Sequence, residues 1–202
     1  MDILWIRHAE PERIESGRGV PADPALTATG RHQADRLAAW LATEPVDVVV
    51  SSPQRRARET AAPIAAAHGL EVVIEPGIVE FDVHADHYIP VDEIRRTDPE
   101  QWQAMITGEW EALGGESAAE FRNRVVGAMD AIIAAHPGRR VVAVCHGGVV
   151  NAVLGAVLGI PSPLWFDPHY TSLSRMVASR TGVRSIVSLN ERAHLDGTRD
   201  RT

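Results

Sequence analysis

Short apolar runs alternate along the chain with segments of helical periodicity, and this alternation constrains the fold more than any other feature. The apolar runs that predict strands lie at residues 3–6, 46–50, 71–74, 140–145, 173–179 and 183–189. The segments that predict helices lie between them, at residues 27–43, 55–68, 91–96, 99–107, 117–136 and 149–158. Strands that alternate with helices indicate an α/β protein. We therefore expect three α/β/α layers around a mostly parallel central sheet.

The chain is expected to form one domain over residues 1–202. Its length of 202 residues suits a single hydrophobic core, and no internal repeat or linker divides it. Residues 80–115 are the least regular part, and we expect them to form a lid or insertion over one end of the sheet. Thr27 and Ser117 are the expected N-caps of two helices, because their hydroxyl groups can accept from first-turn amides.

Composition and charge disfavour several classes of protein. The formal net charge is −7, so no sequence-wide basic stripe is present to bind nucleic acid. No apolar run approaches the ~18 residues of a membrane span, so we expect no membrane partner. A single cysteine, Cys145, cannot form an internal disulfide and is typical of a reducing compartment. We expect a cytoplasmic protein, and a homodimer is one of the assemblies that the sequence leaves open.

Every one of the 20 basic residues is arginine, and lysine is absent. A lysine Schiff base and a P-loop lysine are therefore impossible. Any anion site in this chain must be built from arginine, histidine or backbone N–H groups.

Three of the expected strands end in polar residues of a similar kind. Arg7 and His8 follow the first strand, residues 51–56 follow the second, and residues 145–148 follow the strand that begins at residue 140. Ligands of open α/β sheets bind beyond the carboxyl ends of the strands. Guanidinium groups and helix N-termini both suit phosphate oxygens. Taken singly, these residues are as well explained as caps, solvated faces or close-packed glycines, but together they predict an anion pocket.

Five sequence blocks resemble the signatures of the histidine phosphatase superfamily, also called phosphoglycerate mutase-like. They occur in the family's order from residue 3 to about 195 and read LWIRHAE at 4–10, DPALTATG at 23–30, SSPQRRARETA at 51–61, GES at 115–117 and VCHGG at 144–148. The resemblance implies the α/β fold of that family and a phosphatase activity.

The resemblance also implies a role for each matching residue. His8 corresponds to the nucleophile that becomes phosphorylated, and Arg7 and Arg56 correspond to phosphate ligands. His146 corresponds to the second histidine, which holds the phosphoryl oxygens and would serve best as a cation. Glu80 corresponds to the acid/base that protonates the leaving oxygen and then activates water.

Some of these assignments have a competitor or a departure from the family pattern. Arg55 lies one position early compared with Arg56, and Asp82 is close enough to compete with Glu80. The usual glycine after the nucleophile is Ala9, and the usual asparagine six residues after the nucleophile is Ile14. A hydroxyl or N–H group from residues 171–172 is a further candidate phosphate donor.

The expected function is a phosphomonoesterase that acts through phosphohistidine on a small phosphorylated metabolite, without metal or cofactor. The alternatives are a mutase of the phosphoglycerate type and a non-catalytic module that binds a phosphorylated ligand. The 80–115 segment favours the phosphatase, because it offers only Arg95 and Arg96 as basic side chains. A metal site at His84 and His87 is a weaker alternative that their spacing allows.

The aromatic residues of the same region bear on the leaving group. They suggest an apolar wall for a leaving group larger than glycerate, although core packing explains them equally well. These residues are Phe81, Tyr88, Trp102 and Trp110.

Overall fold

Six strands form the central sheet of the protein, in the order β3-β2-β4-β1-β5-β6. The computed structural model describes residues 1–15, 19–113 and 115–195, so Gly114 and the last part of the expected 1–202 domain lie outside the described residues. The strands are β1 (Asp2–Arg7), β2 (Val48–Ser51), β3 (Val72–Ile74), β4 (Arg140–Cys145), β5 (Leu173–Ala178) and β6 (Arg184–Glu191).

Strands β1 to β4 run in one direction, β5 runs against β1, and β6 runs against β5. β1 pairs in parallel with β4, and β2 pairs in parallel with both β3 and β4. β5 lies antiparallel to β1, and β6 lies antiparallel to β5. A short turn suffices between β5 and β6, whereas parallel neighbours need a long crossover. The expected mostly parallel sheet is confirmed, with an antiparallel pair at one edge.

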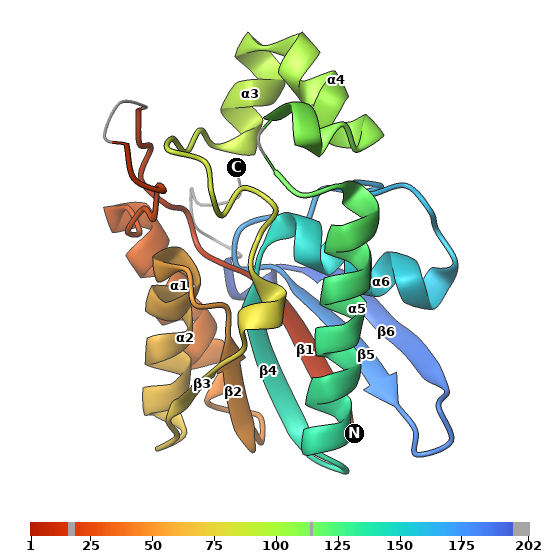
Figure 1. Ribbon diagram of the computed structural model, residues 1–202. Helices are drawn as coiled ribbons and strands as arrows, with labels where there is room; N and C mark the ends of the chain where they lie inside the picture. Colours follow the sequence, from red (N-terminus) through yellow and green to blue (C-terminus); the bar gives the residue numbers. More distant parts are fainter. Residues whose placement is uncertain (16–18, 114, 196–202) are drawn as a thin grey trace.

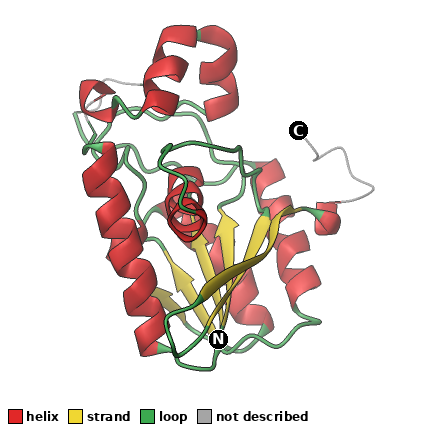
Figure 2. Cartoon of the chain, turned by 90° about the vertical axis from the view of Figure 1, so that its right-hand side faces the viewer, coloured by secondary structure: helices red, strands yellow, loops and turns green. Residues whose placement is uncertain are grey.

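Helices cover both faces of the sheet (Figures 1 and 2). The side chains of β1 alternate between the two resulting cores, as the two-residue period of a strand requires. Leu4 and Ile6 pack in the core under α1 (Ala28–Leu41) and α2 (Arg55–Ala67). Ile3 and Trp5 pack in the core under α5 (Ala118–Ala135) and α6 (Gly147–Leu158). The expected three-layer architecture is thereby confirmed. The described residues also form two shorter α-helices, α3 (Val91–Thr97) and α4 (Pro99–Thr107).

Both expected N-caps are present. The Thr27 hydroxyl accepts from the backbone N–H of Gly30 at 2.9 Å. Ser117 and Glu120 form a reciprocal capping box at the start of α5. Capping of this kind satisfies first-turn N–H groups that have no partner within the helix.

The irregular region contains α3 and α4, which lie together beyond the carboxyl ends of the parallel strands (Figure 1). The sequence predicts both helices but misses three short 3₁₀ helices, at Pro76–Ile78, Trp110–Leu113 and Ala193–Leu195. α6 begins at Gly147, two residues before the predicted start. No helix in the described part of the chain is long and apolar enough to cross a membrane.

Candidate active site

The sheet brings the ends of three strands together. Arg7 is the register partner of Cys145, and Ser51 is the register partner of Val144. The chain then continues in the same pairing, because the backbone N–H of His8 donates to the carbonyl of Cys145 at 2.9 Å. The polar segments that follow β1, β2 and β4 therefore meet at one edge of the sheet, as the sequence predicts.

His8 is held as a neutral imidazole. Its side chain is buried, and its Nδ1 lies 2.8 Å from the carbonyl oxygen of Ala9. A carbonyl only accepts, so Nδ1 carries the proton and Nε2 keeps its lone pair. Burial, followed by the charges of Arg56 and Arg7, holds the pKa of His8 well below its usual value. The site thus presents an unprotonated ring nitrogen, which is what a nucleophile requires.

Arg7 is fixed from two sides. Its Nη1 donates to the carbonyl of Pro168 at 2.6 Å and lies 3.6 Å from a carboxylate oxygen of Asp167. The guanidinium group lies over the ring of Tyr170, 4.2 Å from its centroid. These contacts hold a largely buried cation directly beside the nucleophile.

Arg56 has donors left over. Its Nη2 donates to Asp82 at 3.2 Å, and its guanidinium group lies over the ring of Tyr88. Its Nε and Nη1 are buried without a hydrogen-bond partner. Unsatisfied donors on a buried cation are costly, and two of them beside His8 indicate a place for anionic oxygens.

The neighbouring Arg55 lies in a different environment. Its Nε donates to Glu59 one turn along α2, at 2.6 Å, and about half of its side chain is exposed. Arg56 lines the cavity beside His8, and Arg55 does not.

His146 lies next to His8. Its ring is fully buried with its centroid 5.1 Å from that of His8, and it is absent from the residues that line the cavity. Its Nε2 lies 2.8 Å from the hydroxyl of Ser52, whereas its Nδ1 has no partner. Burial, followed by Arg56 and His8, lowers the pKa of His146, so the site without an anion favours a neutral ring instead of the cation that we expected.

Glu80 is a buried carboxyl group tied to the start of α6. Its Oε2 accepts from the backbone N–H of Gly148 at 2.8 Å, and its Oε1 accepts from that of Phe81 at 3.2 Å. Its own backbone N–H donates to the Gln54 side chain at 3.0 Å. Burial, followed by the charge of Asp82, raises the pKa of Glu80 to about 7. This value suits a group that gives and takes a proton near neutral pH.

Gly148 is required by this contact. A Cβ at this position would lie 2.3 Å from Oε1 of Glu80, closer than any side chain tolerates. The glycine therefore allows the carboxyl group to approach the helix N-terminus.

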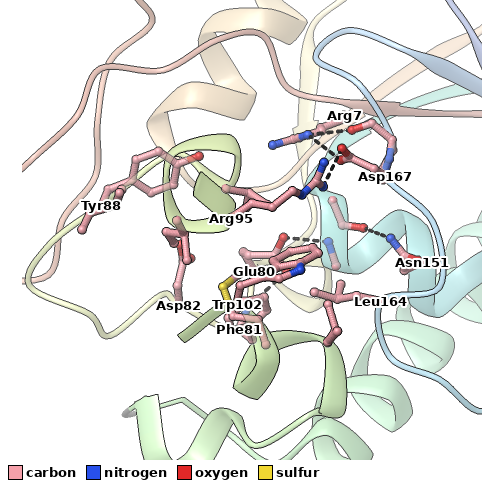
Figure 3. A pocket seen from close by; sticks show the side chains of 18 of the residues that line it. Arg7, Glu80, Phe81, Asp82, Tyr88, Arg95, Trp102, Asn151, Leu164 and Asp167 are labelled. Carbon is pink, nitrogen blue, oxygen red and sulfur yellow. Dashed lines mark hydrogen bonds and ion pairs between the residues drawn. The ribbon is translucent and has the colours of Figure 1, made fainter. Parts of the chain in front are cut away.

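The cavity next to these residues has a volume of about 370 Å³, within the size range of small-molecule sites. Arg7, His8, Arg56 and Glu80 form one end. The other end is built by α3, α4 and the segment 164–168 that follows α6. Figure 3 shows Arg7 and Arg95 both directed at Asp167, and the guanidinium group of Arg95 lies over the ring of Trp102.

Some candidate residues lie elsewhere. Thr171 and Ser172 do not line the cavity. The backbone N–H of Thr171 donates to the carbonyl of Arg7 at 3.1 Å and so supports the strand end. Ile14 makes a backbone bridge to Tyr88, and Ala9 is not among the described residues with positive φ, so a Cβ is tolerated there.

Sequence reasoning missed several residues of this site. Asp167, Arg95 and Asn151 line the cavity, and Ser52 and Gln54 hold His146 and Glu80. Ser52 and Gln54 lie within the block that resembles the family, which is a signal that points to them. Asp167 and Arg95 have no comparable signal.

The metal alternative finds no support among the described residues. In residues 1–15, 19–113 and 115–195, no three His, Cys, Asp or Glu side chains gather closely enough to hold an ion. His84 and His87 therefore do not form the site that their spacing allows.

The fold and this edge of the sheet define an α/β protein with paired histidines and arginines around an anion pocket. The sequence pattern of the histidine phosphatase superfamily (branch 1) matches residues 3–192. The chain belongs to that family.

The relatives of this chain include a phosphatase and a probable mutase. The chain is 36% identical to phosphoserine phosphatase 1 of Hydrogenobacter thermophilus over 96% of its own length and 93% of the relative. It is 28% identical to a probable phosphoglycerate mutase of Serratia proteamaculans, over 80% of this chain and 77% of that one. A mycobacterial glucosyl-3-phosphoglycerate phosphatase solved with VO3 has the same fold, with a TM-score of 0.78, 22% identity, and coverage of 95% of this chain and 99% of that chain.

Proposed function

We propose that the chain is a metal-independent phosphomonoesterase that transfers the phosphoryl group of a small phosphorylated metabolite to His8 and then to water. One observation carries the proposal. A buried neutral His8 lies beside Arg56, whose Nε and Nη1 are unpartnered, at the end of a cavity that also holds Glu80. The phosphatase names of the relative from Hydrogenobacter thermophilus and the mycobacterial structure support the same reaction.

The first step joins Nε2 of His8 to phosphorus as the bond from phosphorus to the leaving oxygen breaks. Negative charge is spread over the equatorial phosphoryl oxygens during this in-line transfer. Arg7 and Arg56 stabilise this negative charge. Cations that are already in position stabilise such charge strongly in a site that excludes water. His146 lies next to His8, and its unpartnered Nδ1 is the candidate donor to a phosphoryl oxygen.

Glu80 donates a proton in the first step and accepts a proton in the second. As the protonated acid it gives its proton to the departing alkoxide. As the carboxylate, stabilised by the N–H groups of Gly148 and Phe81, it then takes a proton from the water that attacks phosphohistidine. Asp82 is a weaker candidate, because its carboxylate is already paired with Arg56.

The mutase alternative differs in the fate of the phosphoryl group. A mutase retains the phosphohistidine and returns the group to a sugar-acid product, which needs cations for the product carboxylate. Arg95 is the basic side chain at the far end of the cavity, and it is paired with Asp167 at 2.8 Å. This pairing favours the phosphatase.

Product analysis separates the two reactions. The purified protein is incubated with 3-phosphoglycerate, O-phosphoserine and simple alkyl phosphates, and inorganic phosphate is measured alongside the organic products. We expect one phosphate per alcohol released, with the activity abolished in His8→Ala. An isomeric phosphoester formed faster than inorganic phosphate would establish the mutase instead. Tight binding of phosphoesters with no turnover of any of them would establish the binding module.

Three broader proposals accompany this function. The segment 80–115 serves as the lid of one domain, supported by the position of α3 and α4 beyond the strand ends. The cytoplasmic location rests on the lone Cys145, which is a buried free thiol. A homodimer stays a prediction that a measurement of mass in solution tests.

A further inference from the structure

The far end of the cavity is apolar. Beyond the phosphate end, its lining consists mainly of aliphatic and aromatic side chains from α3, α4 and the segment after α6. They include Ile94, Trp102, Met105, Ile106, Leu164 and Phe166. Figure 3 labels Trp102 and Leu164 among the side chains that line the cavity.

Two polar side chains at this end, Asn151 and Arg95, already have partners within the protein. Asn151 uses all of its amide: its Nδ2 donates to the carbonyls of Gly147 and Phe166, and its Oδ1 accepts from the N–H groups of Trp165 and Phe166. Arg95 donates to Asp167 at 2.8 Å, and one of its faces lies over Trp102, 4.7 Å from the ring centroid. A ligand group that took the Asn151 amide, or that displaced Asp167 from Nη2 of Arg95, would first have to break these contacts.

The charged side chains that line the cavity nearly cancel one another, so they leave no excess positive charge for an anion in addition to the phosphate group. Among the residues that the structure describes, the lining contains three arginines and three carboxyl groups: Arg7, Arg56 and Arg95 against Glu80, Asp82 and Asp167. With Glu80 protonated, the sum is one positive charge, and a phosphate dianion beside Arg7 and Arg56 already exceeds it. A carboxylate on the leaving group would meet the carboxylate of Asp167, whose partner Arg95 is already paired with it.

We infer that the preferred substrates are phosphomonoesters of uncharged, apolar alcohols of aryl-alkyl size, whose leaving group packs against Trp102, Leu164 and Phe166. The inference rests on the proposed phosphatase function and names its substrate class. It differs from what the name of the relative from Hydrogenobacter thermophilus would imply, since phosphoserine carries both an ammonium group and a carboxylate. The neutral Arg95–Asp167 pair closes the far end without binding the substrate ionically.

The test compares kcat/KM for 2-phenylethyl phosphate, ethyl phosphate and O-phosphoserine, scored by phosphate release. We expect 2-phenylethyl phosphate to exceed each of the others by about tenfold or more, the usual effect of filling an apolar pocket. Equal or better turnover of O-phosphoserine would overturn the inference and leave the phosphatase function standing. Failure of all three esters to release phosphate would overturn both.

Substitutions of Trp102 test whether this side chain causes the preference for 2-phenylethyl phosphate. Trp102→Ala should bring the ratio of 2-phenylethyl to ethyl phosphate down toward one, mainly by raising KM for the larger ester. Trp102→Phe should restore most of the ratio. Trp40→Ala is the matched control, because Trp40 lies on α1, is 43% exposed and is not part of the cavity. The ratio should stay unchanged in Trp40→Ala, and an unchanged ratio in Trp102→Ala would contradict the inference.

Arg95→Met tests the role of the ion pair. The variant keeps a long side chain against Trp102 and removes the charge, so we expect the preference for 2-phenylethyl phosphate to persist. A loss confined to O-phosphoserine would identify Arg95 as a carboxylate receptor and would overturn the inference.

Discussion

Arg55 and Arg56 are adjacent in the chain, but only Arg56 is buried beside His8 with two unpartnered nitrogens. Arg56→Ala should therefore weaken vanadate binding and slow turnover by about 10²–10³, the usual scale for one stabilising donor. Arg55→Ala should change both by much less, because it breaks only a half-exposed pair with Glu59. Titration with vanadate and steady-state kinetics on both variants measure this difference. The opposite order of effects would place the phosphate ligand one residue earlier.

Glu80 and Asp82 differ in what already binds them. Glu80 accepts from two backbone N–H groups, whereas Asp82 is paired with Arg56. Glu80→Gln should cripple turnover of alkyl phosphates, whose leaving oxygen needs a proton. It should harm p-nitrophenyl phosphate much less, because nitrophenolate departs without one. If Asp82→Asn showed this selective loss and Glu80→Gln did not, Asp82 would be the acid.

The dependence of kcat/KM on pH is a second test of the role of Glu80. Glu80 acts as an acid while protonated, so kcat/KM for alkyl phosphates should fall as the pH rises through about 7, the raised pKa of this carboxyl group. This fall in kcat/KM with rising pH should be absent in Glu80→Gln. The same shift makes folding bind a proton: the contribution of Glu80 to stability is intact below the ordinary pKa of 4.5 and falls as the pH rises to about 7.

At the scale of elements, the start of α6 depends on the absence of a side chain at Gly148. Gly148→Ala would place a methyl group 2.3 Å from Oε1 of Glu80. We expect a loss of stability of about 1–3 kcal/mol from this overpacking, together with a selective loss of alkyl phosphate turnover as the carboxyl group is displaced. Chemical denaturation and the two-substrate assay measure these effects.

Gly127→Ala is the matched control for that variant. Gly127 also lies in a helix, α5, and a Cβ there would meet nothing within 4 Å. Alanine should stabilise the helix by about 0.5–1 kcal/mol and leave turnover unchanged. If Gly148→Ala behaved like Gly127→Ala, the contact between Glu80 and α6 would have no functional weight.

Most elements could be predicted because their signals are local. Residues close together in the sequence determine the caps at Thr27 and Ser117, the apolar periodicity of α1 and the apolar run of β4. The start of α6 was missed by two residues, because Gly147 and Gly148 are poor helix formers and their place in the helix depends on His146 and Glu80. The short 3₁₀ turns leave no periodic signal to find.

At the scale of the whole molecule, the sequence predicts which residues meet at the strand ends, but not what surrounds them. Parallel strands bring Arg7, His8 and His146 to one edge whatever the loops do. Asp167 and Arg95 come from a loop and a short helix whose packing is tertiary, so no local pattern reveals their pairing. The complete burial of the His146 ring likewise follows from tertiary packing that no local pattern reveals.

The central claim is that His8 carries the phosphoryl group during turnover. The most direct measurement is a rapid quench of the protein with a phosphoester, followed by peptide mapping of acid-labile, base-stable phosphate. The account predicts one phosphate on the peptide that contains His8, formed before steady-state product release, and none in His8→Ala. A His8→Ala variant that turned over faster than about one-thousandth of the normal rate, or phosphate trapped on another residue, would contradict it.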